Sequence, residues 1–167
     1  MVLGLSLAAF TQLHVALSLI GIIAGLIVAL SMLSANRPPA LTALFLASTA
    51  LTDITGFLFP MPFDPADVVG IIDLAAVLIA LLALYGNHLA RAWRWVYVVS
   101  AVVSLYLNCF VLVVQTFQKV PFFHQFAPTG KEPAFAAAQG VLLVLFVCLA
   151  IAALRRFKPR STVSVMV

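Results

Sequence analysis

Two acidic residues lie inside long apolar stretches of the sequence, where a charge is hardest to accommodate. Asp53 lies seven residues before Pro60, and Asp73 lies six residues after Asp67. At about 1.5 Å of rise per helical residue, both carboxyls are expected roughly 9–10 Å from the same side of a membrane that the two stretches cross in opposite directions. Ionisable side chains within membrane spans are costly and usually mark a site or pathway for an ion or a proton. Asp53 and Asp73 are therefore the first candidates for a functional role.

Other polar side chains are expected in the same layer of neighbouring helices. In the second apolar stretch, the helical repeat places Thr49, Thr52 and Asp53 on one face. Small and polar helix faces turn inward in membrane bundles. We therefore predict a polar pocket that binds an ion or a small ligand, lined by His14, Asp53, Asp73, Asn108, Gln115 and Gln139.

Each residue of this predicted pocket also has a purely structural interpretation. Asp73 is close to the start of its helix, where the helix dipole and the free N–H groups favour a carboxylate. Asp53 is close to the end of its helix, so its structural alternative is a protonated carboxyl that hydrogen-bonds across the bundle. For the three amides and the imidazole, the alternative is hydrogen bonding or packing between helices.

The composition identifies the class of protein that positions these side chains. The chain has 167 residues, of which 65% are hydrophobic and only 8% are charged, and its mean hydropathy is +1.20. A typical soluble domain has about 25% charged residues, and a soluble fold of this size cannot hide so much apolar surface. These values exclude an ordinary soluble enzyme, a nucleic-acid-binding protein and a disordered chain. They predict an all-α integral membrane protein whose surroundings are the lipid bilayer.

Five stretches are long and apolar enough to cross a bilayer, which requires roughly 20 residues. They cover about residues 13–33, 40–59, 65–85, 95–117 and 134–154. The third begins at Asp64 and Pro65, a pair that is typical of a capped helix start. None of the stretches alternates with a period of two, which excludes an outer-membrane barrel. We therefore predict a five-transmembrane-helix bundle that forms one domain over residues 1–167.

Lysine and arginine are distributed unevenly between the two sides of this bundle. Because such residues are enriched on the cytoplasmic side, we expect the N-terminus outside and the C-terminus in the cytoplasm. The expected location is a bacterial-type inner (plasma) membrane. Trp93, Trp95 and Tyr97 are expected at the cytoplasmic boundary as an aromatic belt. The side with seven basic residues holds Arg37, Arg91, Arg94, Arg155, Arg156, Lys158 and Arg160, and the other side holds Lys119 and Lys131.

Three classes of function fit two buried carboxylates. The hypothesis that we favour is binding or transport of a cation, a proton or a small polar solute, because such a pair can exchange a proton for a cation. The second is a membrane-embedded hydrolase or metal-dependent enzyme that uses Asp53 and Asp73 as acid and base or as ligands. The third is an accessory subunit or a protein that binds lipid, quinone or haem. The sequence identifies neither a metal nor another cofactor.

Two further features bear on redox chemistry and assembly. Cys109 and Cys148 lie in apolar runs without a CxxC or metal-ligand spacing, so we interpret both as small core residues. Gly21 and Gly25 form a GxxxG motif, which favours close helix packing within the chain or between subunits. A homo-oligomer is therefore compatible with the sequence.

Overall fold

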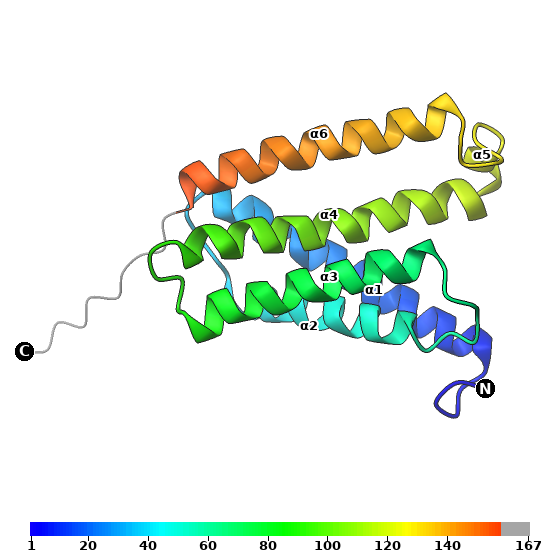
Figure 1. Cartoon of the computed structure of the whole chain (residues 1–167), viewed down its shortest axis with the longest axis horizontal. Helices are drawn as coiled ribbons and strands as arrows, with labels where there is room; N and C mark the ends of the chain where they lie inside the picture. The colour runs from blue at the N-terminus through cyan, green and yellow to red at the C-terminus, as the bar shows by residue number, and fades with distance from the viewer. Residues whose placement is uncertain (158–167) are drawn as a thin grey trace, which may run out of the picture.

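The computed structural model describes residues 1–157, and these residues form a bundle of helices without a β-strand. The five long helices run alternately in opposite directions, so the start of α1 and the end of α6 lie at opposite ends of the bundle (Figure 1). A π-helical turn, η1, follows α3 directly. The elements are α1 (Leu7–Leu33), α2 (Pro39–Gly56), α3 (Pro65–Leu81), η1 (Leu82–Gly86), α4 (Trp93–Lys119), the short α5 (Pro121–His124) and α6 (Pro133–Arg156).

The charged residues divide between the two ends of the bundle. We call one the basic end, and it carries Arg37, Arg91, Arg94, Arg155 and Arg156. We call the other the acidic end, and it carries Asp64, Asp67 and Glu132 beside Lys119 and Lys131. α1 begins at the acidic end and α6 finishes at the basic end (Figure 1).

Local sequence explains where the later helices begin. Proline occupies the first position of α2, α3, α5 and α6, where its missing N–H group costs nothing. At α3, the Asp64 carboxylate accepts hydrogen bonds from the backbone N–H groups of Ala66 and Asp67, and the Asp67 carboxylate accepts one from the N–H of Asp64. This capping box confirms the predicted helix start at Asp64 and Pro65.

The first helix begins earlier than its apolar run predicts. α1 starts at Leu7, whereas hydropathy places the start near residue 13. The Ser6 hydroxyl accepts a hydrogen bond of 3.2 Å from the N–H of Ala9. This bond satisfies one of the N–H groups that a helix start leaves free. The apolar leader of the sequence is therefore part of the helix.

The second helix ends earlier than its apolar run predicts. α2 stops at Gly56 rather than near residue 59. The N–H groups of Leu58 and Phe59 bond to carbonyls three residues back, which is a tighter turn than the α-helix. Pro60 follows directly and disfavours helical backbone at the residue before it. Asp53 consequently lies within one turn of the end of α2.

Four helices are long and apolar enough to cross a membrane, which indicates a multi-pass membrane protein. They are α1, α3 together with η1, α4 and α6. α2 is not among them, because its 18 residues include one aspartate, one serine and four threonines.

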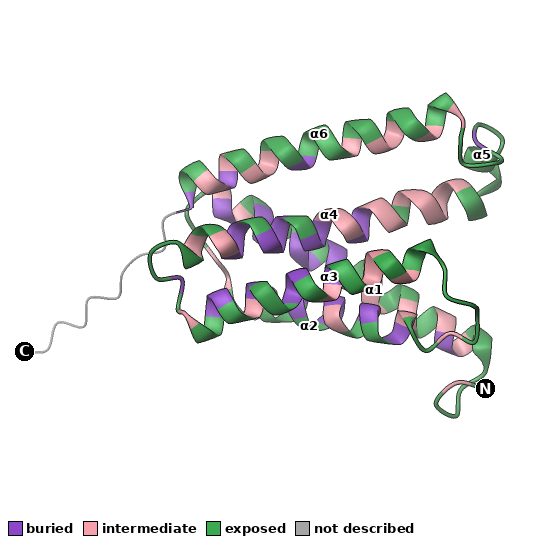
Figure 2. Cartoon of the chain, viewed as in Figure 1, coloured by how far each residue is buried: buried purple, intermediate pink, exposed green. Residues whose placement is uncertain are grey.

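Burial along α2 is inverted relative to that of a helix in a soluble protein. The helix packs against α1 and α3, and its aspartate, its serine and all four threonines are buried. The side that faces outward is apolar and consists of Ala43, Leu44, Ala47, Leu51 and Ile54 (Figure 2). The polar face that the helical repeat predicts for α2 is therefore the inward face.

Gly21 and Gly25 bring α1 close to α2. A Cβ atom added to Gly25 would lie 2.8 Å from Cδ2 of Phe45 and 2.7 Å from Cδ1 of Leu105. A Cβ atom added to Gly21 would lie 3.1 Å from Oγ of Ser48. The GxxxG motif is therefore occupied by packing within the chain, and it offers no argument for a homo-oligomer.

The interior near the basic end is apolar. Tyr97 is fully buried, and its ring packs against Phe157 with the centroids 6.1 Å apart. The prediction that Tyr97 belongs to an aromatic belt is therefore wrong, whereas Trp93 and Trp95 are exposed. The reason is rotational: residues two positions apart in a helix point in different directions, so Tyr97 faces inward when Trp95 faces outward.

α6 lies at the periphery of the bundle. It packs against α4 and α1, and within the helix only Phe146 and Ala153 are buried. Cys148 is exposed on α6, whereas Cys109 on α4 is buried. The prediction that both cysteines are core residues is therefore wrong for Cys148, because α6 has too few neighbours to bury its whole circumference.

Candidate functional site

α2 and α3 bring Asp53 and Asp73 into the interior of the bundle. Their side chains are only 8% and 3% exposed, respectively. α2 packs against α3, so the two carboxyls lie on neighbouring helices. Neither helix contains a lysine, arginine or histidine that could balance a carboxylate charge.

Asn108 of α4 holds the Asp73 carboxylate. Its Nδ2 atom donates a hydrogen bond of 2.5 Å to Oδ2 of Asp73 and another of 3.2 Å to the carbonyl of Ser104. The Ser104 hydroxyl lies beside the same carboxylate but outside hydrogen-bonding geometry, and its Oγ atom has no partner. Oδ1 of Asp73 is likewise buried without a partner. One carboxylate thus links α3 to α4 while one of its oxygens remains unpaired.

A second group of unpaired oxygens lies on α2. Oδ2 of Asp53 is buried without a hydrogen-bond partner, and so is Oγ1 of Thr49, one turn earlier on the same face. Most buried polar atoms in native proteins are hydrogen-bonded. A concentration of unpaired oxygens around two carboxyls is therefore a place where a proton, an ion or water would complete the bonding. We call Thr49, Asp53, Asp73, Ser104 and Asn108 the aspartate cluster.

His14 is attached to α2 through Thr55 rather than through an aspartate. Its Nδ1 atom lies 2.9 Å from Oγ1 of Thr55, and the Thr55 hydroxyl is within 2.7 Å of the carbonyl of Leu51, to which it donates. We therefore assign the proton of this contact to His14 Nδ1, which leaves Nε2 as the acceptor of the ring. The imidazole also packs edge-on against Phe59, with centroids 5.3 Å apart.

The two glutamines of the predicted pocket lie on α4 and α6. Nε2 of Gln139 donates a hydrogen bond of 3.2 Å to the carbonyl of Phe110 and so joins α6 to α4. The Oε1 atoms of Gln115 and Gln139 are both buried without a partner. The structure thus joins Asp73 and Asn108 directly, buries Asp53 on the neighbouring helix α2, and gives His14 and Gln139 separate partners.

The described residues contain no cluster of the usual metal-ligating side chains. Within residues 1–157, no three His, Cys, Asp or Glu side chains are close enough together to hold a metal ion. His124 lies at the exposed acidic end, with Nδ1 3.1 Å from the carbonyl of Phe117. His14, by contrast, is partly buried and contacts Thr55.

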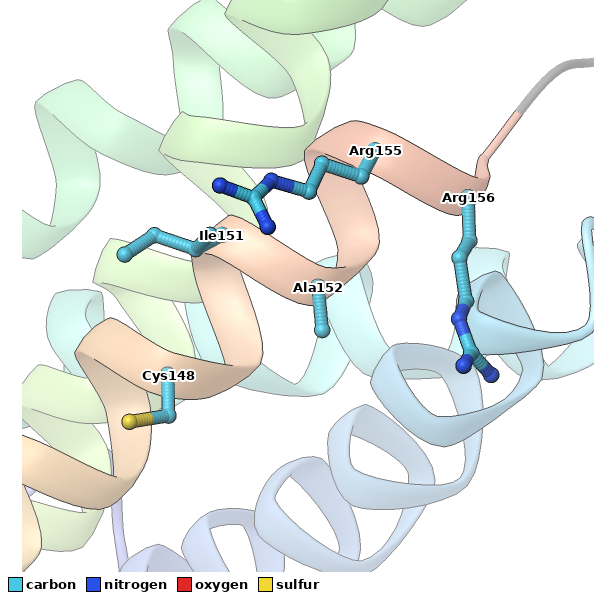
Figure 3. A pocket seen from close by; sticks show the side chains of 5 residues that line it. All are labelled: Cys148, Ile151, Ala152, Arg155 and Arg156. Carbon is cyan, nitrogen blue, oxygen red and sulfur yellow. The ribbon is translucent and has the colours of Figure 1, made fainter.

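A surface pocket lies apart from the aspartate cluster. It has a volume of about 410 Å³ and is situated on α6 near the basic end (Figure 3). Its lining contains none of the residues of the predicted polar pocket; the residues are Cys148, Ile151, Ala152, Arg155 and Arg156. The aspartate cluster, in contrast, is made of buried side chains, so a ligand there would be enclosed by helices.

Three contributors are missing from the set of residues predicted from sequence. The helical repeat predicts Thr49 on an inward face, and Ser104 lies one turn before Asn108 on α4, but the lack of hydrogen-bond partners for their hydroxyls depends on neighbouring helices. Thr55 lies three residues after Thr52, and this spacing is the only sequence signal that it shares the buried face. Its contact with His14 spans 41 residues of sequence and could not be read from spacing.

Comparison with known proteins assigns no family to this chain. No family model, no curated protein and no solved structure matches it. The functional conclusion therefore rests on the residues and contacts described above.

Proposed function

We propose that this protein binds a proton or a small cation at the aspartate cluster and carries it across a membrane. The observation on which the proposal rests is that Asp53 and Asp73, on the neighbouring helices α2 and α3, each have a buried carboxylate oxygen without a partner. Buried charges require compensation, and a bound cation or proton would supply it. The neighbouring hydroxyl oxygens of Thr49 and Ser104 suit a hard cation, which prefers oxygen ligands. A small polar solute with a positive group would use the same oxygens.

We also infer that α2 is a fifth span. Its 18 residues correspond to about 27 Å at 1.5 Å per residue, close to the roughly 30 Å of hydrocarbon in a bilayer. The outward face of α2 is apolar and its polar residues are buried, which is the distribution expected of a helix surrounded by lipid. The alternation of five helices then separates the two ends of the bundle by the membrane.

The proposed orientation has the basic end in the cytoplasm of a cell with a bacterial-type inner membrane. The basic end holds five arginines and no acidic residue of the described chain, which is the asymmetry of the positive-inside rule. The acidic end is then outside. His14, Gln115 and Gln139 are nearer to this end than the aspartate cluster, and we propose that they line its entrance.

Flux through reconstituted protein tests the proposal. Vesicles that contain a pH-sensitive dye and the purified chain should show cation-driven proton movement, which Asp53→Asn and Asp73→Asn should each reduce to the level of protein-free vesicles. Asp64→Asn is the matched control, because it makes the same chemical change at an exposed position and asparagine still caps a helix. Flux should persist in this variant.

Different outcomes separate transport from binding. Undiminished flux in both aspartate variants would contradict the proposal. Another outcome is that the wild-type protein shows no flux but binds a cation in calorimetry, and that Asp53→Asn abolishes this binding. The proposed binding site would then be supported, whereas the proposed transport would be contradicted. The enzyme alternative requires a different arrangement, because a hydrolytic pair shares a proton or water between its two carboxyls, whereas one oxygen of Asp73 is bonded to Asn108.

A further inference from the structure

One face of α6 combines an apolar stripe with two arginines. The residues that line its pocket are spaced at i, i+3, i+4, i+7 and i+8, which is one continuous helix face. The apolar members come first and the arginines last, at the basic end of the bundle (Figure 3). In chain order they are Cys148, Ile151, Ala152, Arg155 and Arg156.

The shape of the pocket separates the two guanidinium groups. In Figure 3 the side chains of Arg155 and Arg156 extend in different directions, and Ala152 lies between them. The small side chain of Ala152 leaves the helix surface between the two arginines uncovered. Arg155 lies seven positions after Cys148, which is about 10 Å along the helix. The lining residues thus extend along α6, with the two charges at one end.

No acidic side chain of this protein is available to neutralise the two arginines. Two of the chain's acidic residues are in the aspartate cluster and three are at the acidic end; they are Asp53, Asp73, Asp64, Asp67 and Glu132. At the same end of α6, Arg94 of α4 donates to the carbonyls of Leu154 and Phe157. An anion from outside the chain would therefore complement the positive charge of Arg155 and Arg156.

We propose that this pocket binds an anionic phospholipid, with the phosphate between Arg155 and Arg156 and an acyl chain along Ile151 and Cys148. Arginine binds phosphate with its planar, multiply donating guanidinium group. α6 is apolar enough to cross a membrane, and Ile151 and Cys148 are exposed on it, so both contact lipid tails in a bilayer. A phospholipid is the ligand that joins a phosphate to an apolar chain in this arrangement. The inference is independent of the aspartate cluster.

Lipid binding to the full chain in nanodiscs provides the test. Discs of phosphatidylcholine with increasing phosphatidylglycerol would be compared by native mass spectrometry of the lipids that remain bound. Arg155→Gln/Arg156→Gln should weaken phosphatidylglycerol retention by roughly 25-fold. This factor corresponds to about 2 kcal/mol, because each basic residue near an anionic lipid surface contributes about 1 kcal/mol of binding free energy. The matched control, Lys119→Gln/Lys131→Gln, removes the same charge at the acidic end and should leave retention unchanged.

The thiol of Cys148 allows a second measurement, which uses the wild-type protein and so does not depend on whether a variant folds. Cys148 is exposed and lines the pocket, whereas Cys109 is buried. Alkylation of Cys148 by a membrane-permeant maleimide should slow as phosphatidylglycerol replaces phosphatidylcholine. The proposal would be overturned if both double variants lost phosphatidylglycerol retention equally. It would also be overturned if the alkylation rate of Cys148 did not change with the lipid composition. Displacement of phosphatidylglycerol by inorganic phosphate alone would also overturn it, since the acyl chain would then contribute nothing.

Discussion

The two halves of the bundle are held together in different ways. Towards the basic end the interior is built from large apolar side chains that are completely buried, such as Met32, Val98 and Phe157. From the middle to the acidic end, the interior contains one oxygen of each of the two carboxylates, two glutamine oxygens and two hydroxyl oxygens that have no hydrogen-bond partner. The Tyr97 hydroxyl is the unpaired oxygen of the other half.

This contrast indicates that the half towards the basic end mainly stabilises the fold, whereas the half towards the acidic end carries the proposed function. Close apolar packing supplies most of the free energy of a folded core, whereas unpaired buried polar groups reduce it. Such groups are retained where they take part in binding or proton transfer. We therefore expect substitutions in the basic half to change stability most, and substitutions in the aspartate cluster to change activity at a smaller cost in stability.

The largest effect is expected from truncation of a side chain in the apolar half. Phe45→Ala removes a ring that is 1% exposed, and such truncations cost about 3–5 kcal/mol. Phe126→Ala in the exposed segment after α5 is the control and should change stability by no more than about 0.5 kcal/mol. Loss of helical circular dichroism during titration with a denaturing detergent would measure both. If Phe45→Ala and Phe126→Ala lost similar amounts of stability, the apolar half would have no special role in stabilising the fold.

The contact of α1 with α2 predicts an effect of intermediate size. Gly25→Ala places a methyl group within 2.9 Å of Phe45 and Leu105 side-chain atoms, and this overpacking should cost about 1–3 kcal/mol. Gly140→Ala on α6 meets no atom within 4 Å, so its better helix propensity should be neutral or stabilise by up to about 1 kcal/mol. In the same detergent titration, Gly25→Ala should lower stability and Gly140→Ala should not. Changes of the same sign in both variants would contradict a close contact of α1 with α2 at Gly25.

Removing the Asn108 side chain tests how much its hydrogen bond to Asp73 contributes to the stability of the polar half. Asn108→Ala leaves both oxygens of Asp73 without a donor, which should cost about 1–3 kcal/mol. In the double variant with Asp73→Asn, this cost should fall, because the stranded charge is gone. A double-mutant cycle on detergent stability measures the coupling. Strictly additive losses would indicate that Asn108 acts by packing alone.

The smallest expected change in stability has the opposite sign. Asp53→Asn removes a buried carboxyl that has an oxygen without a hydrogen-bond partner, so stability should rise by about 1 kcal/mol while flux or cation binding is lost. Asp64→Asn should leave both properties nearly unchanged. A destabilised Asp53→Asn protein would mean that this carboxyl has a structural partner, and the proposed separation of stability from function would fail at the cluster.

Much of the fold follows from local sequence, and the two ends of α3 illustrate why. The capping box at Asp64 depends only on residues that are neighbours in the chain, and the π-helical turn that continues α3 ends at Gly86, close to the predicted end of the third apolar stretch near residue 85. The inward face of α2 follows from the helical repeat, because a strip of small polar residues has one favourable direction in an apolar bundle.

The remaining features depend on which helices become neighbours. Tyr97 faces inward and Cys148 faces outward because of how α4 and α6 are rotated against the other helices, and hydropathy does not determine rotation. The partner of His14 depends on where α2 ends, which the turn at Leu58 and Phe59 decides. Hydropathy also ranks α6 above α2 as a span, although α2 is the more deeply packed helix.

The alternation of an odd number of long helices has a consequence for joining copies of this chain. The start of α1 and the end of α6 lie at opposite ends of the bundle (Figure 1). A short peptide that connects the end of one copy to the start of the next would therefore invert the second copy. Two fused copies would form an antiparallel pair, with the aspartate cluster of one nearer to one face and that of the other nearer to the opposite face. Parallel copies in one polypeptide would require an additional helix between them.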